Sequence, residues 1–322
     1  MGFHSRLSRL ALIAGLAAMV VLLVGPSAAG QQNMLRFRWT KGEPVRYRMT
    51  QETTTSLNMP PMGDMSVGNT FAQVWVMTPQ EIATDGTVTV ATKIESAKMD
   101  LTSQFMSISY DSTKPPQPGD PAAEIGNVVS AMIGPILTMT IAPDGTVISV
   151  SGMAAIRDKA LAAMPGVGAV LGGMGGIQDM LSDDAIKGAY AQLFAVLPPK
   201  QVKAGETWTN EIKQPNAMGD LTIARTITHK GVEKVDGRDL TKLGLTFTVK
   251  AGQGRSIGPV TMQASEGAGE GEILFDHSAG RLYRQTSRHS QPITMAIAAP
   301  TGETMNAAGT VQITQTLQLI EK

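Results

Sequence analysis

A serine, an aspartate and a histidine in the second half of the chain match a catalytic pattern. Residues 254–258 read Gly-Arg-Ser-Ile-Gly, the Gly-x-Ser-x-Gly pattern of a serine nucleophile, and Asp276 and His289 follow in the hydrolase order. That chemistry needs the serine on a turn between a strand and a long helix, within reach of the histidine. Pro259 and the strand-forming residues after it do not begin such a helix, and too few residues separate Ser256 from His289. We expect a loop serine and no catalytic residues.

Methionine supplies a second candidate site. Met59, Met62 and Met65 are spaced three apart around two prolines, and thioethers at this spacing can gather around the soft ion Cu(I). The chain also contains 20 methionines, and methionine is a common filler of apolar surfaces where aromatic residues are few. Two interpretations stay open, a copper site and an ordinary loop between strands.

A glycine-rich segment at residues 165–176 reads Pro-Gly-Val-Gly-Ala-Val-Leu-Gly-Gly-Met-Gly-Gly. It lacks the Gly-Lys-Ser/Thr of a phosphate-binding loop and does not follow a strand, so a flexible connector between two helices is expected. Its apolar side chains raise the hypothesis of a ligand-binding lid over a hydrophobic cavity, formed by Val167, Val170, Leu171 and Met174.

Acidic residues gather near a histidine in the last third of the chain. No His-x-x-x-His or EF-hand spacing accompanies them, and strand alternation would place Glu270, Glu272 and Asp276 on one solvated face beside His277. We expect neither a metal site here nor a cofactor.

Composition excludes several classes of function. The 322 residues carry 27 basic and 27 acidic side chains, so broad electrostatic attraction to nucleic acid is absent. A stripe of Arg36, Arg38, Arg46 and Arg48 on paired strands would lack interleaved aromatics, which indicates a solvated sheet face. The absence of cysteine excludes disulfides and thiolate sites. With 42% hydrophobic and 17% charged residues, the chain is expected to fold.

Residues 1–29 have the organisation of a secretory signal peptide. Arg6 and Arg9 precede an apolar run at residues 10–24, which spans about 22 Å as a helix, less than the ~30 Å hydrocarbon layer. Small residues suit cleavage after Ala29. Because neither cysteines nor Asn-x-Ser/Thr sites follow, we expect a bacterial protein that is periplasmic or secreted, with no transmembrane segment after cleavage.

Alternation with a period of two dominates the rest of the chain and predicts antiparallel strands. Val45, Tyr47 and Met49 alternate with Arg46 and Arg48, and residues 311–319 behave likewise. Asp-Gly pairs suit tight hairpin turns, and they occur at residues 85–86, 144–145 and 236–237.

Three helices are predicted in the middle of the chain, at residues 120–132, 153–164 and 182–197. The third has Ser182 as its N-cap and an apolar stripe, composed of Ile186, Tyr190, Leu193, Phe194 and Leu197. The predicted fold is mainly β: a large antiparallel twisted sheet, or two related sheets, with the helices packed on the apolar face.

A weak repeat suggests two related β halves, since Lys41-Gly42-Glu43 and Ala204-Gly205-Glu206 precede similar strand patterns. The predicted organisation is a first β half at residues 30–151, a helical insert with the glycine-rich segment at 152–197, and a second β half at 198–322. Recurrent turn chemistry in a β-protein explains the same pattern without duplication.

Two longer motifs resemble an uncharacterised family of exported bacterial proteins, a domain of unknown function. Residues 197–208 read Leu-Pro-Pro-Lys-Gln-Val-Lys-Ala-Gly-Glu-Thr-Trp, and residues 275–282 read Phe-Asp-His-Ser-Ala-Gly-Arg-Leu. The resemblance implies no activity. From the residues themselves, Gly205 and Gly280 are expected at turns, and Trp208 and Leu282 as core anchors.

Two functions are left open by these observations. The first is an exported, non-enzymatic envelope protein that binds an apolar small molecule or lipid between sheet and helices, by analogy with half-barrel lipid carriers. The alternative is a structural or protein-interaction module of the envelope, with an unknown protein partner.

Overall fold

The computed structural model describes residues 34–60, 63–114, 123–162, 182–215, 220–252, 254–257, 260–298 and 304–321. The predicted signal peptide, Met62 and the predicted lid residues Val167, Val170, Leu171 and Met174 lie outside these ranges. Leu35–Lys322 form one compact unit, and the fold below is that of this unit.

Fourteen strands of the described residues form a single antiparallel sheet, which confirms the predicted fold class. They are β1 (Val45–Met59), β2 (Gly63–Ile82), β3 (Val88–Ser103), β4 (Ser107–Asp111), β5 (Leu137–Ile141), β6 (Val147–Ser151), β7 (Thr207–Gln214), β8 (Leu221–Val235), β9 (Arg238–Ala251), β10 (Arg255–Ile257), β11 (Val260–Ala264), β12 (Gly267–Asp276), β13 (Arg281–Ala298) and β14 (Thr304–Ile320).

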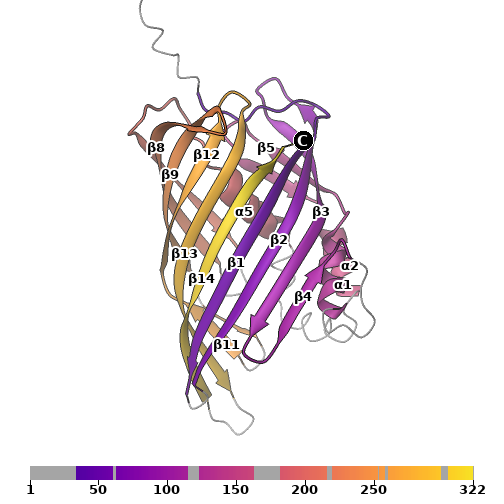
Figure 1. The fold of residues 1–322 in the computed structure, drawn as a ribbon, viewed down its shortest axis with the longest axis vertical. Helices are drawn as coiled ribbons and strands as arrows, with labels where there is room; N and C mark the ends of the chain where they lie inside the picture. The colour runs from indigo at the N-terminus through magenta and orange to yellow at the C-terminus, as the bar shows by residue number, and fades with distance from the viewer. Residues whose placement is uncertain are drawn as a thin grey trace, which may run out of the picture. The chain divides into compact units, whose positions relative to one another are not determined.

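The strand order places the first and last strands side by side. It runs β6-β5-β3-β2-β1-β14-β13-β12-β9-β8-β7, with β4 on β3, and β11 on both β13 and β10. In Figure 1, indigo β1 accordingly lies against yellow β14. From this seam the chain runs outward to β6, then re-enters the sheet at its opposite edge with β7 and runs back to β14. Both halves of the sequence therefore contribute to one sheet.

The predicted hairpin turns form where the sequence places Asp-Gly. Asp236 and Gly237, between β8 and β9, have φ values of 49° and 79°, as a tight turn with two left-handed residues requires. Gly205 and Gly280 also have positive φ, and the anchors Trp208 and Leu282 that follow them are buried.

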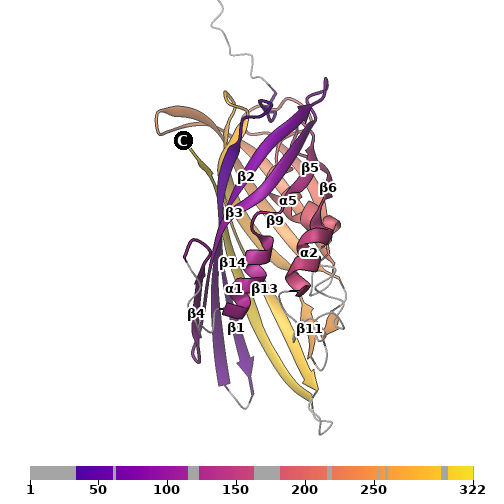
Figure 2. The same cartoon turned by 90° about the vertical axis from the view of Figure 1, so that its right-hand side faces the viewer.

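Three helices of the described residues lie on one face of the sheet, here called the inner face, which carries Tyr47 and Met49 (Figure 2). They are α1 (Ala123–Met132), α2 (Met153–Ala162) and α5 (Asp183–Phe194). The Ser182 hydroxyl oxygen caps α5 by accepting from the Ala185 N–H at 3.1 Å, as predicted. None of the described helices has the length and apolar character needed to span a membrane.

A cluster of aromatic rings joins α5 to both halves of the sheet. The ring of Phe37 lies 5.8 Å from that of Phe194 and 5.5 Å from that of Phe275. Phe37 is held in place by its N–H, which donates to Pro143 O at 2.7 Å. The segment before β1 therefore packs its Phe37 ring into the core and is hydrogen-bonded to the turn at Pro143.

Because residues 34–40 are not in a strand, Arg36 and Arg38 do not lie on the solvated sheet face on which they were expected. Arg36 instead donates to Pro198 O at 2.7 Å, and Arg46 on β1 pairs with Glu95 at 3.2 Å.

Candidate functional site

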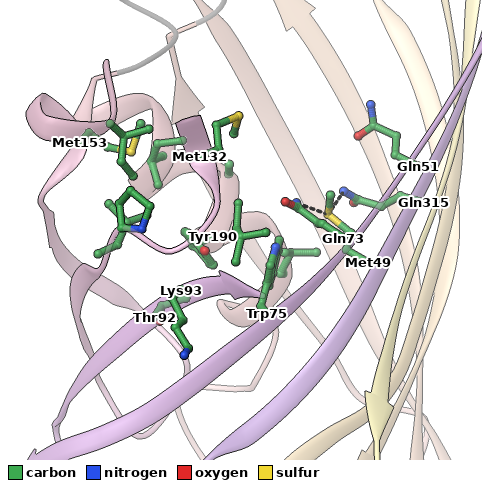
Figure 3. Close-up of a pocket in the computed structure, with 17 residues that line it drawn as sticks. Met49, Gln51, Gln73, Trp75, Thr92, Lys93, Met132, Met153, Tyr190 and Gln315 are labelled. Atoms are coloured by element: carbon green, nitrogen blue, oxygen red, sulfur yellow. Dashed lines mark hydrogen bonds between the residues drawn. The ribbon is translucent and has the colours of Figure 1, made fainter. Parts of the chain in front are cut away.

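A cavity of about 190 Å³ lies between the inner face of the sheet and the helices (Figure 3). Strands β1, β2, β3, β5 and β14 form one wall, and α1, α2 and α5 form the other. The apolar side chains that line it include Met49, Trp75, Ile94, Met132, Leu137, Met153, Ile156, Ile186, Tyr190 and Leu193.

Strand alternation builds the sheet wall. Met49 on β1 is paired with Gln73 on β2, and Tyr47 with Trp75, so these side chains point to the inner face. A register shift between Val74 and Trp75 marks the place where β3 bends beside the cavity.

The helical wall is tied together at the start of two helices. The Met153 N–H at the beginning of α2 donates to Asp183 Oδ1, in the first turn of α5, at 3.1 Å. Tyr190 of α5 then packs its ring 5.0 Å from that of Trp75 on β2. The predicted apolar stripe of α5 therefore faces the sheet.

Arg225 on β8 anchors the other end of α5. Its side chain is 3% exposed, and it donates to Gln192 O and to Asn210 Oδ1, both at 2.8 Å, and to Ala195 O. Burial lowers the pKa of Arg225 to about 10. A cation at the last carbonyls of a helix also complements the helix dipole. Arg225 therefore holds the C-terminal end of α5 against strand β8.

Three polar atoms of the lining are buried without a hydrogen-bond partner in the described residues: Gln73 Oε1, Trp75 Nε1 and Thr92 Oγ1. The sulfur of Met49 accepts from Gln73 Nε2 at 3.8 Å and from Gln315 Nε2 at 3.4 Å.

The part of the lining that the structure describes is mainly apolar. It contains no carboxylate and no histidine, and burial raises the pKa of Tyr190 above its ordinary value, so its hydroxyl stays neutral. Lys93 belongs to the lining but is exposed. An engineered apolar cavity of about 150 Å³ holds benzene, so this cavity can hold a ring or a segment of an alkyl chain.

The hydrolase-like residues are not brought together. Ser256 lies in the short strand β10, rather than in the predicted loop, and pairs with Thr261, which in turn pairs with Ala296 on β13. His289 is seven residues from Ala296 along that strand, roughly 23 Å at about 3.3 Å per residue. Its ring lies against Phe247 instead, at 5.8 Å.

The predicted solvated acidic face forms only in part. Glu270 pairs with Arg288, and Glu272 with Lys242 at 2.7 Å. Asp276 was expected in solvent on the same face but is buried at the end of β12, where the turn that follows packs against its carboxylate. Its Oδ1 accepts from the N–H groups of residues 278 and 279, so it closes a turn.

The described part of the copper motif lies at the β1–β2 hairpin. Leu57 is paired with Met65, and Met59 with Gly63, so Met59 and Met65 share one face of the sheet. Met62 lies outside the described residues, and the copper site stays a prediction. Within the described ranges, no three His, Asp or Glu side chains gather as metal ligands.

Sequence patterns did not identify the polar lining of the cavity. Phe71, Gln73 and Trp75 alternate toward the inner face of β2, so Gln73 is a polar residue among side chains that are otherwise apolar. This break in the apolar alternation was the one feature of the sequence that could have indicated a polar group in the cavity.

A comparison with protein families gives one match, to a model described as "Family of unknown function (DUF6263)", over residues 85–281. The chain belongs to the DUF6263 family. The expected resemblance to a family of unknown function is thereby confirmed. The DUF6263 match includes all three described helices and β3, whereas Gln73 and Trp75 lie before it. No curated protein matches the chain.

A comparison with solved structures gives matches of low similarity. A structure titled "Lipid-protein interactions in lipovitellin" matches with a TM-score of 0.46 and 10% identity, over 88% of this chain and 26% of that one. The DUF6263 protein thus spans about a quarter of the lipovitellin chain. An outer membrane channel from Pseudomonas putida F1 matches with a TM-score of 0.22 and 6% identity, over 88% of this chain and 97% of that one. DynF, from the dynemicin pathway of Micromonospora chersina, gives a TM-score of 0.20 and 8% identity, over 87% and 83%.

Proposed function

We propose that this DUF6263 protein is an exported, non-enzymatic envelope protein that binds an apolar ligand, such as part of a lipid, between the sheet and the helices. The cavity of about 190 Å³ carries the proposal. Protein interiors are close-packed, and side chains that border an unfilled space lose van der Waals contacts, which is a cost in stability. A ligand that fills the cavity recovers part of that cost.

The side chains of the walls suit a ligand of variable shape. Met49, Met132 and Met153 lie on the sheet wall, at the end of α1 and at the start of α2. Methionine has three rotatable bonds and a polarizable sulfur, so it adapts to irregular apolar partners. Trp75 and Tyr190 add broad apolar surfaces on opposite walls.

Two observations support a binding role over an enzymatic one. The described residues of the cavity lining include no carboxylate and no histidine, the side chains that most often act as general acids and bases. The register also separates Ser256 from His289 along the sheet.

A matched pair of alanine substitutions tests the binding site. Ala189 on α5 lines the cavity, whereas Ala155 on α2 is exposed. The purified, delipidated protein should enhance the emission of the neutral apolar probe N-phenyl-1-naphthylamine. Ala189→Phe should abolish the enhancement by filling the cavity, and Ala155→Phe should leave it unchanged. Equal enhancement by both variants would contradict the proposed site.

Export is proposed from the basic, apolar and small-residue order of residues 1–29. Fractionation of bacteria that produce the full chain with a C-terminal tag tests it. A shortened product outside the cytoplasm is expected, and an uncleaved product in the cytoplasm would contradict export.

An exposed hairpin tip favours the second candidate, a protein-interaction module. Phe105 and Met106, between β3 and β4, are 75% and 50% exposed, and exposed apolar groups of this kind often mark contact sites. A photo-crosslinker at position 105 should capture one recurrent protein if this role holds. Unlabelled parent protein added as a competitor should reduce this capture, whereas the unlabelled Phe105→Ser variant should not. The Phe105→Ser variant should still bind the probe normally.

A further inference from the structure

Hydrogen-bonding groups are concentrated in this otherwise apolar cavity. Gln73, Trp75 and Thr92 are 8%, 4% and 1% exposed, respectively. Eight buried polar side-chain atoms of the described residues have no partner, and three of these eight line this one cavity. Buried polar groups are normally paired, because an unpaired one loses its hydration without compensation. The cluster therefore points to a polar group of a ligand.

The polar atoms of Gln73 and Trp75 are complementary in kind. The two residues alternate to the same face of β2. The amide nitrogen of Gln73 donates to Met49 Sδ at 3.8 Å, while its carbonyl oxygen points into the cavity (Figure 3). The indole of Trp75 can only donate. Together they offer one acceptor and one donor.

The geometry points to a ligand with a neutral hydroxyl on an apolar body, such as an alkyl alcohol or a lipid with a free hydroxyl. The hydroxyl donates its proton to Gln73 Oε1 and accepts from Trp75 Nε1–H, while the apolar part lies against Tyr190 and Leu193. This inference rests on the proposed function, since it specifies the ligand class of the same cavity. Thr92 Oγ1 adds a third polar atom from β3, which can donate or accept.

An anionic head group fits the same position less well. An ionised carboxylate has no proton for Gln73 Oε1, and burying it away from a cation is costly. The one cationic side chain of the lining, Lys93, is exposed. A carboxylate drawn to Lys93 would leave the acceptor of Gln73 without a partner. An ether likewise accepts from Trp75 but cannot donate to Gln73.

Three ligands of equal chain length test the inference: octan-1-ol, its methyl ether and octanoate. Their affinities for the protein that remains after cleavage of the predicted signal peptide are measured by displacement of N-phenyl-1-naphthylamine at pH 7. The variants are Gln73→Met, which removes the acceptor at similar volume, and Gln291→Met. Gln291 is a buried glutamine on β13 that lies outside the cavity lining, so it serves as the matched control.

The Gln73→Met substitution should weaken octanol binding relative to the ether by about fivefold, the size expected for one neutral hydrogen bond. The control Gln291→Met should leave that ratio unchanged, and octanoate should bind more weakly than octanol. A ratio that is unchanged in Gln73→Met would overturn the inference. Failure of all three ligands to displace the probe would instead reject the proposed function.

A measurement on the unmodified protein keeps the test independent of folding of the variants. The indole N–H resonance of Trp75 should move downfield in a ¹H–¹⁵N spectrum when octanol is added, as expected for a donor that gains an acceptor. The indoles of Trp39 and Trp208 lie outside the lining and should move little. Displacement of the probe by octanol with no change at Trp75 would overturn the hydroxyl assignment.

Discussion

Replacing Arg225 by methionine should destabilise the protein and loosen the helical wall of the cavity. The last carbonyls of a helix have no partner within the helix and carry partial negative charge. Arg225 supplies hydrogen bonds to two of them, Gln192 O and Ala195 O, and to Asn210 Oδ1. Methionine fills similar apolar volume but donates to none of these acceptors.

The expected loss of stability follows from two opposing effects. The three hydrogen bonds that the charged guanidinium donates are worth about 2 kcal/mol each, or about 6 kcal/mol together. Burial of the guanidinium lowers the pKa of Arg225 to about 10, and removing the buried charge returns about 3 kcal/mol of that desolvation penalty. The net loss for Arg225→Met is therefore about 3 kcal/mol.

Urea unfolding followed by circular dichroism measures this loss, and hydrogen exchange of α5 measures the loosening. Arg48→Met is the matched control, because Arg48 is an exposed arginine on β1; it should change stability by less than about 0.5 kcal/mol. Exchange in α5 should accelerate in Arg225→Met more than exchange in β13. Stability within 0.5 kcal/mol of the parent, or unchanged protection of α5, would refute the proposed anchoring.

Three further predictions concern a turn, a histidine and the methionine motif. Gly145→Ala should lower stability in urea by more than about 2 kcal/mol, because Gly145 has a φ of 86° and a Cβ would overlap the carbonyl of Phe194; Gly134→Ala, with positive φ but open space, should cost less. Burial lowers the pKa of His289, so the unfolded chain binds this proton more readily and stability should fall as pH drops below about 6.5, by at most ~1.4 kcal/mol per pH unit. His289→Phe should reduce that slope, and an unchanged slope would contradict it. If the copper hypothesis holds, Cu(I) affinity measured by competition with a chromogenic chelator should fall at least tenfold when leucine replaces Met59, Met62 and Met65, and an unaltered affinity would reject the site.

Local features of the fold were predictable from the sequence. Alternation along β1 sets which side chains face inward, because successive side chains of a strand point to opposite faces. The start of α5 followed from Ser182, and the hairpin at Asp236 and Gly237 from the left-handed conformation that this pair tolerates. Each of these choices depends on a few neighbouring residues.

The sheet order and the cavity were not predictable in this way, because they depend on contacts between distant segments. No local pattern places β1 beside β14. The cavity unites Met49, Thr92, Met153 and Tyr190, which are separated widely in the chain. The burial of Asp276 depends on how the turn after β12 folds back onto its carboxylate, which the alternation of the strand does not show.

The most direct test of the binding cavity is a crystal structure of the processed protein grown with a bromine-tagged alkyl alcohol. Anomalous scattering locates the bromine without reference to the rest of the ligand. The bromine should lie between the sheet and the helices near Met132 or Met153, with the hydroxyl between Gln73 and Trp75. A bromine on the outer face, or side chains that close the space between Trp75 and Tyr190, would contradict the account.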